Sequence, residues 1–297
     1  MSALEDKLSG WTGPSSEFEK DKQDRTERMI KEAVQNHPGF RNCSLSVYAK
    51  GSYANNTNVR ADSDVDIAVQ CHDVLYWDEA ASGSKRSAGT PYIGPWTPDK
   101  LRSELRWALE AKFPRQVDSS GSTAFRINSS TARVDADVIP CFDYRYYFLS
   151  GGHRDGAKTF KKDGSSLINY PEQQLANGNA KNRRTGTRYK KAVRIMKRIE
   201  NAMVASGEHR EVPSFFVECL VYNVPDTIFQ RSTWASIIRG VIVHIYEGLK
   251  GSEPDDDNAR WLEVNECKYL FHIGQKWKRQ DGRDFVQAAW NYLGYTS

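Results

Sequence analysis

The run from residue 51 to residue 69 constrains the fold of this chain more than any other part of it. It begins with Gly51-Ser52 and ends in the segment 64–69, in which aspartates and aliphatic side chains alternate. Successive side chains of a β-strand point to opposite sides of its sheet, so this alternation predicts a strand with one aliphatic face. Asp64 and Asp66 then lie together on the opposite, non-core face.

This run also predicts a chemistry. A second alternating segment, 45–49, runs into Gly51-Ser52, where glycine lets backbone amides approach a phosphate and serine adds a hydroxyl donor. Two carboxylates about 7 Å apart along one strand face suit a hard divalent cation held beside that phosphate. An Asp-x-Asp pair alone is usually a solvated strand edge, but its combination with the upstream Gly-Ser favours a metal site.

A third acid is expected from a neighbouring strand, because two metal ions need ligands from more than one side. The segment 133–140 reads Arg-Val-Asp-Ala-Asp-Val-Ile-Pro and places Asp135 and Asp137 on one face. Either residue fits the role of ligand. The other would then form a surface salt bridge with Arg133 or Arg145.

Charge is distributed unevenly along the 297 residues, although the net charge is only +4. Residues 158–198 hold twelve Lys or Arg and two acids, whereas residues 62–79 are acidic. This arrangement fits a metal-dependent phosphate enzyme, and without the motif above it would equally fit two unrelated solvated faces. The basic segment is suited either to substrate phosphates or to a long polyanion.

Composition indicates the class and compartment of the protein. No apolar stretch approaches the ~20 residues of a membrane span, and the acidic N-terminus carries no signal pattern, so we expect a cytoplasmic protein with no membrane partner. Five cysteines without a Cys-x-x-Cys pair argue against a disulfide framework and a zinc ribbon, and we expect free thiols.

Periodicity predicts an α+β fold. We expect a long N-terminal spine helix at 15–36, a loop at 82–98, a helix from Thr97-Pro98 to before Pro114, and strands near 124–127 and 132–139. After about residue 165 the pattern predicts helices, near 183–205, 214–223, 231–249, 259–277 and 283–293. A catalytic lobe of residues 1–160 with a twisted mixed sheet would thus face a helical nucleotide-binding lobe of residues 161–297 across a nucleotide cleft.

These residues carry a resemblance to a known family. Gly51-Ser52, Asp64-Val65-Asp66 and Asp137-Val138-Ile139-Pro140 resemble the polymerase-β-like nucleotidyltransferases, and within them the cGAS/DncV-like nucleotidyltransferases (CD-NTases) of bacterial antiphage systems. The resemblance covers roughly residues 15 to 295, because helical-lobe segments follow in the family's order: Asn169-Tyr170-Pro171, Lys181-Asn182, Tyr189-Lys190, Arg194-Ile195-Met196-Lys197 and Pro213-Ser214-Phe215-Phe216-Val217-Glu218. The Asn-Tyr-Pro segment is most similar to the CdnE-type clade.

The resemblance implies a catalytic arrangement for the sheet. Gly51-Ser52 would hold the donor triphosphate, while Asp64 and Asp66 would bind two Mg²⁺ ions, for which Mn²⁺ can substitute. Asp137, rather than Asp135, would ligate the ion that activates the attacking ribose hydroxyl. The implied reaction is in-line attack on the α-phosphate of a ribonucleoside triphosphate, with release of pyrophosphate. The implied product is a cyclic oligonucleotide second messenger, read by a downstream effector protein.

The resemblance also implies nucleotide contacts in the helical lobe. Lys197 and Ser214 would bind the leaving triphosphate, with Lys190 as a second candidate, and Phe215 would stack on the donor base. The alternatives are a solvated helix position for Lys197 and a core position for Phe215.

Asn169 is expected to read the base. Its amide can pair with the O4 and N3–H edge of uracil, and asparagine in this segment accompanies pyrimidine use in the resembled clade. UTP and ATP are therefore the favoured substrates, giving cyclic UMP-AMP or cyclic di-UMP. Alternatively, Asn169 caps the helix that follows it. Tyr53 and Asn55 are further candidates for the same pocket.

Two other functions share these features. A template-independent polymerase of the oligoadenylate or tRNA-tailing type would use the same three acids to make linear products. A nucleotide- or RNA-binding module would keep the fold without turnover. Because the sequence lacks the Cys/His zinc insertion of the DNA-activated animal sensor, we expect no activation by double-stranded DNA.

Overall fold

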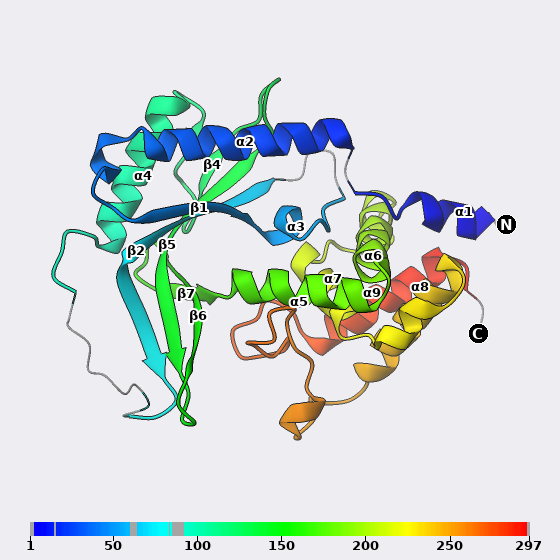
Figure 1. The fold of residues 1–297 in the computed structure, drawn as a ribbon. Coiled ribbons are helices and arrows are strands. Elements are labelled where there is room, and N and C mark those ends of the chain that lie inside the picture. Colours follow the sequence, from blue (N-terminus) through cyan, green and yellow to red (C-terminus); the bar gives the residue numbers. More distant parts are fainter. Residues whose placement is uncertain (1–2, 15, 60–63, 83, 85–91, 296–297) are drawn as a thin grey trace. The chain divides into compact units, whose positions relative to one another are not determined.

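The computed structural model describes residues 3–14, 16–59, 64–82, 84 and 92–295 (Figure 1). The chain divides into two compact units. The sheet unit comprises Ser16–Tyr53 and Arg60–Pro171, and the helical unit comprises Met1–Ser15, Ala54–Val59 and Glu172–Ser297. The short segment 54–59 thus packs with the helical unit, although it lies in sequence between two parts of the sheet unit.

The sheet unit is built on a seven-stranded mixed sheet with the order β1-β2-β5-β4-β3, in which β6 pairs with β5 and β7 with β6. Only the central pair of β2 and β5 is parallel among the pairings described. The strands are β1 (Leu45–Lys50), β2 (Val65–Glu79), β3 (Val117–Asp118), β4 (Phe125–Ile127), β5 (Ala136–Tyr147), β6 (His153–Phe160) and β7 (Ser166–Asn169).

Two helices share a hydrophobic core with this sheet. They are α2 (Glu17–Gln35) and α4 (Pro98–Lys112), and both have side-chain caps at their first turn. Ser16 and Glu19 form a capping box at α2, and Thr97 accepts from the Lys100 amide at α4, where Pro98 fits the first helical position. The core lies between these helices and the sheet face that carries the aliphatic side chains of β2 and β5. The sheet unit also contains the short helix η1 (Pro38–Phe40) and most of α3 (Gly51–Ala54). The last residue of α3, Ala54, belongs to the helical unit.

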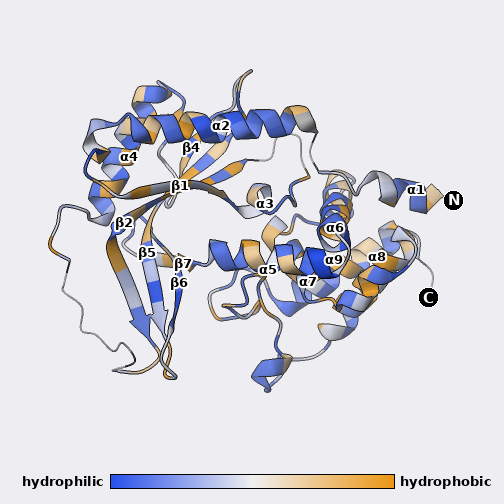
Figure 2. Ribbon diagram, viewed as in Figure 1, coloured by the Kyte–Doolittle hydropathy of each residue, from blue (hydrophilic) through white to orange (hydrophobic). Residues whose placement is uncertain are grey.

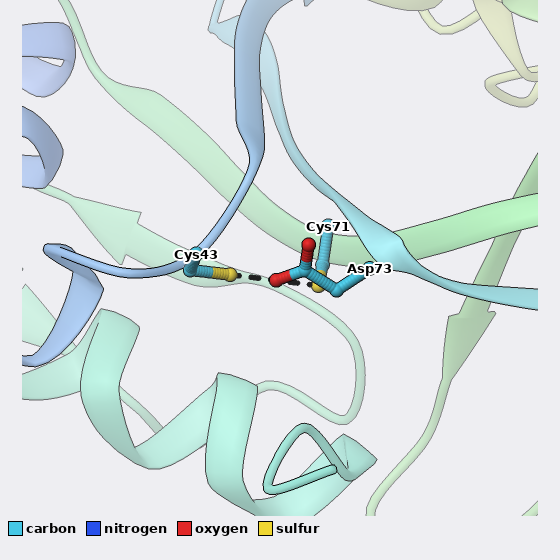
Figure 3. Close-up of side chains that lie close together, drawn as sticks. All are labelled: Cys43, Cys71 and Asp73. Atoms are coloured by element: carbon cyan, nitrogen blue, oxygen red, sulfur yellow. Dashed lines mark hydrogen bonds between the residues drawn. The ribbon is translucent and has the colours of Figure 1, made fainter. Parts of the chain in front are cut away.

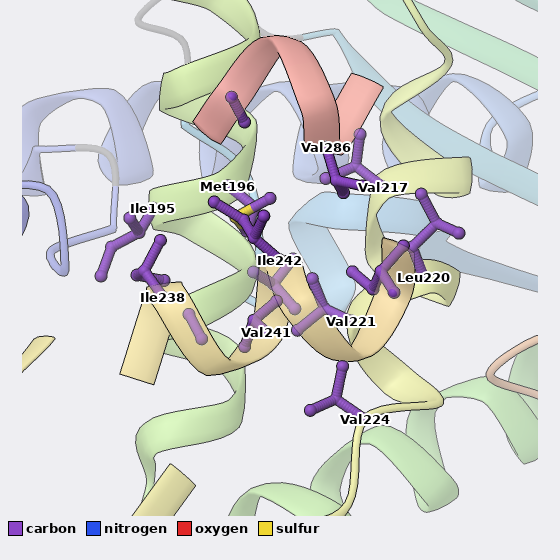
Figure 4. Close-up of a cluster of buried hydrophobic side chains, with 14 of the residues drawn as sticks. Ile195, Met196, Val217, Leu220, Val221, Val224, Ile238, Val241, Ile242 and Val286 are labelled. Atoms are coloured by element: carbon purple, nitrogen blue, oxygen red, sulfur yellow. The ribbon is translucent and has the colours of Figure 1, made fainter. Parts of the chain in front are cut away.

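The helical unit has its own core, which α6, α7, α8 and α9 build largely from aliphatic side chains (Figure 4). Figure 2 shows the contrast between α8, which is rich in hydrophobic residues, and the mostly hydrophilic α5. The elements are α1 (Ala3–Gly10), α5 (Pro171–Arg184), α6 (Arg188–Ala205), α7 (Ser214–Tyr222), η2 (Asp226–Gln230), α8 (Trp234–Gly248), η3 (Asp257–Ala259) and α9 (Arg279–Tyr292). Among the described residues, no helix combines the length and the apolar character needed to cross a bilayer.

The predicted helix at 259–277 is wrong. After η3, residues 262 and 269 form an isolated β-bridge, and the Leu270 amide donates to the Trp261 carbonyl at 2.7 Å. The Asn223 side chain also bonds both backbone groups of Leu262. These bonds use the backbone groups that a helix would need.

Other elements were misplaced by local patterning. The predicted helix at 183–205 begins only at Arg188, because Gly186 (φ 57°) and Thr187 (φ 64°) adopt left-handed backbone between α5 and α6. Helix α5 was not predicted apart from its last two residues. Strands β6 and β7 and helix α1 were not predicted, and β2 and β5 extend far beyond the expected segments. Residues 83 and 85–91 of the expected loop at 82–98 lie outside the described residues.

Candidate active site

The two central strands of the sheet bring the predicted acids together. Asp66 of β2 and Asp137 of β5 are direct partners in the parallel pairing, so their backbones lie about 4.8 Å apart. Asp64 stands immediately before β2. Val65 and Val138 face the core, and strand alternation therefore places the three aspartates on the opposite face of the sheet, as predicted.

The carboxyl groups on this face are not electrically balanced. Burial raises the pKa of Asp66, and the neighbouring charge of Asp64 raises it further, against the opposing effect of Lys50. Burial and then the charge of Asp66 likewise raise the pKa of Asp137. The charge of Asp64 thus makes the ionisation of Asp66 harder, and that of Asp66 makes the ionisation of Asp137 harder. A divalent cation with oxygen ligands would relieve this repulsion. The donor set fits such a cation.

Gly51 brings the Gly-Ser turn against one of these acids. Its φ of +68° is left-handed, and a Cβ at this position would lie 2.5 Å from the Oδ2 of Asp66. Only glycine avoids this overlap and adopts the conformation without strain. Gly51 and Ser52 open α3 directly after β1, whose last residue, Lys50, pairs with Asp66. The predicted adjacency of turn and acids is therefore present within the sheet unit.

Arg126 is a member of this face that the sequence analysis missed. It pairs with Asp137 across β4 and β5, and its guanidinium lies 3.2 Å from Asp64 and 3.0 Å from Asp135. The charge is contributed by a three-residue strand whose sequence carries no motif. The signal that could have found it is the position of a basic residue between two core residues, Phe125 and Ile127.

Asp135 forms an ion pair with this arginine. Burial opposes its ionisation, but hydrogen bonds from the Ser129 amide and from Arg126 outweigh that effect and lower its pKa. The predicted salt-bridge partner was wrong, since Arg133 donates to the Asn128 carbonyl and Arg145 pairs with Asp155. The register of β4 decides this pairing, and local sequence does not reveal it.

Asn169 is the last residue of β7, where its backbone pairs with Ala157 of β6. Its side chain is partly exposed, and α5 begins two residues later at Pro171. The structure therefore places Asn169 in the same sheet as the acids, two strand pairings away from β5. Tyr53, the other pocket candidate of this unit, packs against the core and donates its hydroxyl proton to Asp24.

The predicted nucleotide contacts of the helical unit lie on α6 and α7. Ser214 is the first residue of α7 and is exposed, while Phe215 is partly buried with its ring 6.3 Å from that of Trp277. The solvated alternative for Lys197 is wrong, because its side chain is only 3% exposed. Lys190 is also buried.

Lys197 belongs to a buried polar cluster that includes two residues of segment 54–59. Its ammonium lies 3.4 Å from Glu218 and 3.4 Å from the Thr57 hydroxyl. Glu218 accepts from Thr57 at 2.8 Å and from the Asn55 amide at 3.3 Å. Arg194 adds a bond from its guanidinium to the Asn56 carbonyl at 2.5 Å. The stretch that continues the Gly-Ser turn is therefore anchored to α6 and α7.

Lys190 differs from Lys197 in its partner. Its ammonium donates to the neutral Asn179 amide at 2.6 Å, and burial lowers its pKa although the charge of Glu218 partly opposes this. A buried cation whose hydrogen-bond acceptor is neutral is still short of negative charge. This environment suits the binding of an anion.

Comparison with known proteins identifies the family. The model of the cGAS/DncV-like nucleotidyltransferase C-terminal helical domain matches residues 176–294. The protein described as cyclic dipyrimidine nucleotide synthase CdnE of Cecembia lonarensis is 33% identical over 98% of this chain and 98% of its own. The chain belongs to the cGAS/DncV-like nucleotidyltransferases, in the CdnE clade. The prediction of the family is thereby confirmed.

Other relatives of this CD-NTase agree in fold but differ in product. The cyclic dipurine nucleotide synthase of Elizabethkingia meningoseptica is 36% identical over 99% of this chain and 100% of its own. The solved structure of the CdnE c-UMP-AMP synthase of Rhodothermus marinus, with Apcpp and Upnpp, superposes with a TM-score of 0.82 and 26% identity, covering 99% of this chain and 98% of that one. These matches confirm the α+β nucleotidyltransferase fold and the enzyme class, and divalent-metal use is a property of the family.

Proposed function

We propose that this CD-NTase joins ribonucleoside triphosphates into a uridine-containing cyclic dinucleotide, cyclic UMP-AMP or cyclic di-UMP, and releases pyrophosphate. The observation that carries the proposal is the direct pairing of Asp66 with Asp137, on the sheet face that also holds Asp64 and lies against Gly51. Relatives that match nearly the whole chain are named as cyclic dinucleotide synthases of both base classes.

In this proposal the sheet unit holds the reacting groups. Asp64, Asp66 and Asp137 would hold two Mg²⁺ ions, with Mn²⁺ as a substitute, and Asp137 would serve the attacking ribose hydroxyl. When bound, such ions stabilise the charge on the attacking and leaving oxygens. Gly51 presents backbone close to the acids, and Ser52 supplies a hydroxyl donor for the triphosphate.

The helical unit would bind the triphosphate and the base. Ser214 is exposed at the first position of α7, where backbone amides are unpaired and favour an anion, and Phe215 beside it offers a ring for stacking. Of the two lysines, Lys190 is the better direct phosphate ligand because its present acceptor is neutral. Lys197, paired with Glu218, would act by fixing the segment 54–59, which follows the Gly-Ser turn in sequence.

The basic residues of α5 and α6 support small nucleotides rather than nucleic acid as partners. Lys181 and Arg184 both pair with Asp226 at 2.8 Å, and Arg194 donates to backbone carbonyls. Charges satisfied within the fold contribute little to a polyanion-binding strip. We therefore propose that the protein acts in the cytoplasm on free triphosphates, that its product reaches an effector protein, and that double-stranded DNA does not activate it.

The product decides the proposal. Purified protein is incubated with the four ribonucleoside triphosphates and Mg²⁺ or Mn²⁺, treated with phosphatase, and examined by mass spectrometry. We expect a phosphatase-resistant cyclic product that contains uridine. Linear products would instead indicate the template-independent polymerase, and consumption of no triphosphate under any of these conditions would indicate a binding module.

Asn169→Ser tests the base-reading residue separately. Loss of the amide removes the group that pairs with uracil, so we expect the ratio of UTP to purine use to fall by about tenfold or more, as is usual when a polar base contact is lost. Glu172→Gln, an exposed change in the first turn of α5, is the matched control. An unchanged base ratio in Asn169→Ser would leave Asn169 without this role.

A further inference from the structure

A second group of ligand-type side chains lies in the sheet unit, apart from the three aspartates. Cys43 precedes β1, Cys71 lies within β2, and Asp73 follows it in the same strand (Figure 3). Cys71 pairs with Leu45 at the start of β1, whereas Asp66 pairs with Lys50 at its end, a separation of about 16 Å along the strand. Cys71 also faces the core side of the sheet, opposite to the acids.

The pairing of β1 with β2 brings the two cysteines together, and a β-bulge places the aspartate beside them. The pairing of β2 with β5 changes register between Cys71 and Leu75, which turns the segment around Asp73 out of the regular ladder. The Asp73 carboxylate then accepts a hydrogen bond from the Ser44 amide at 3.2 Å, next to Cys43. His72 does not join the group, because its two ring nitrogens contact Asp143 and Ser46.

The spacing of these atoms matches a tetrahedral metal site. The two sulfur atoms lie 3.6 Å apart, and all three ligand atoms lie within 4.8 Å of one another. Two thiolates on one tetrahedral zinc ion, each about 2.3 Å from it, are about 3.8 Å apart. A disulfide would need the sulfur atoms to be about 1.5 Å closer than they are. The observed arrangement therefore needs only a small adjustment to accept a metal.

We propose that Cys43, Cys71 and Asp73 bind a thiophilic divalent cation of the zinc type, with water in the fourth position. Two sulfur ligands and one carboxylate select Zn²⁺ over Mg²⁺, which prefers oxygen ligands only. On binding, each thiol releases its proton to solvent and the sulfur becomes a thiolate ligand. The bond from Ser44 orients the carboxylate.

Access and anchoring are both present. Cys71 is buried, Cys43 is partly buried and Asp73 is exposed, so an ion can enter from the side of Asp73 and reach the buried thiol. The ion would close a loop from residue 43 to residue 71 that contains β1, the Gly-Ser turn and two of the three aspartates. Closing such a loop restricts the unfolded chain, so metal binding should raise Tm. The site neither depends on the proposed reaction nor contributes ligands to it.

The test uses the full chain, reduced, stripped of metal, and titrated with Co²⁺ or Zn²⁺ in excess Mg²⁺ to occupy oxygen-ligand sites. We expect one equivalent of Co²⁺ to give a thiolate-to-cobalt charge-transfer band, and Zn²⁺ to displace it and raise Tm. Cys43→Ser and Asp73→Asn should each weaken binding by about tenfold or more. Cys267→Ser, a change at a partly buried cysteine of the helical unit, should retain the band.

Because Asp73 is exposed, Asp73→Asn is expected to fold, and its effect can be separated from misfolding by circular dichroism. Absence of the band in the unchanged protein would overturn the proposal. So would equal Co²⁺ affinity of the unchanged protein and both variants. A pair of thiols that oxidises to a disulfide without first binding metal would also overturn it.

Discussion

The acidic face of the sheet and the Lys197 cluster are both groups of charged residues, but they are balanced differently. On the sheet, Asp66 and Asp137 are adjacent carboxyl groups, and burial raises the pKa of both, helped by the charge of Asp64 at Asp66 and by the charge of Asp66 at Asp137. In the helical unit, one buried lysine meets one buried glutamate, and the hydroxyl of Thr57 bonds both. Charge that the fold leaves unbalanced indicates a place for an external cation, whereas a balanced pair indicates an anchor.

The largest expected effect concerns the unbalanced face. In the double variant Asp64→Asn/Asp66→Asn, pyrophosphate release should fall by about 10³-fold or more, because the oxygen ligands for the cations are lost.

The single variant Asp66→Asn should keep or raise the Tm of the metal-free protein. A raised pKa means that folding disfavours the ionised carboxyl at neutral pH, so removing that charge relieves a cost.

The matched control is Asp155→Asn. This exposed carboxylate of β6 belongs to the same sheet and pairs with Arg145, eight residues along β5 from Asp137. It should retain full pyrophosphate release. If the double variant released pyrophosphate as fast as this control, the assignment of the acids would be wrong.

The second effect concerns the balanced cluster, and it should appear in stability. Lys197→Met leaves the Glu218 carboxylate buried without its cation, and such a change typically lowers the free energy of unfolding by about 3–5 kcal/mol. The double variant Lys197→Met/Glu218→Leu removes both charges and should recover much of that loss. Guanidinium unfolding of the two single variants and the double variant measures the coupling.

Lys191→Met is the control for this experiment, since Lys191 is the partly exposed lysine beside Lys190 on α6. It should change the free energy of unfolding little. Strictly additive effects of Lys197→Met and Glu218→Leu would show that the pair is not an anchor. The contrast between the two regions would then lose its basis.

The smallest expected effect tests whether the positive charge of Arg126 lowers the affinity of the acidic face for Mg²⁺. The arginine is 46% exposed and lies 3.2 Å from Asp64, so the ion pair is worth at most about 1 kcal/mol. Arg126→Gln should free the carboxylate and lower the half-saturating Mg²⁺ concentration by up to about fivefold. Metal titrations of activity measure this, with Arg145→Gln as control. A higher half-saturating concentration in Arg126→Gln would show that the arginine helps to bind the metal complex instead of competing with it.

Local patterning predicted those elements whose signal is contained in a few neighbouring residues. The alternation at 64–69 and the cap at Thr97-Pro98 are of this kind, and both are present. Strand β6 was not predicted because only Ala157 and Thr159 of its eight residues are buried, so the alternation of apolar and polar side chains along it is weak. The helix prediction for 259–277 was wrong because Asn223, which is distant in sequence, bonds the backbone groups of Leu262 with its side chain and so stabilises a β-bridge there.

The sequence alone determined which side chains of a strand share a face, because that depends only on the two-residue period of extended backbone. It thus grouped Asp64 with Asp66, and Asp135 with Asp137. Only the tertiary structure decided that Asp137 pairs with Asp66 across two strands. It also decided that Arg126 forms an ion pair with Asp135, and Lys197 with Glu218. Cys43 and Cys71 likewise meet through strand register. Strand register and burial depend on packing between segments that are distant in sequence, so a pattern within a few neighbouring residues cannot predict them.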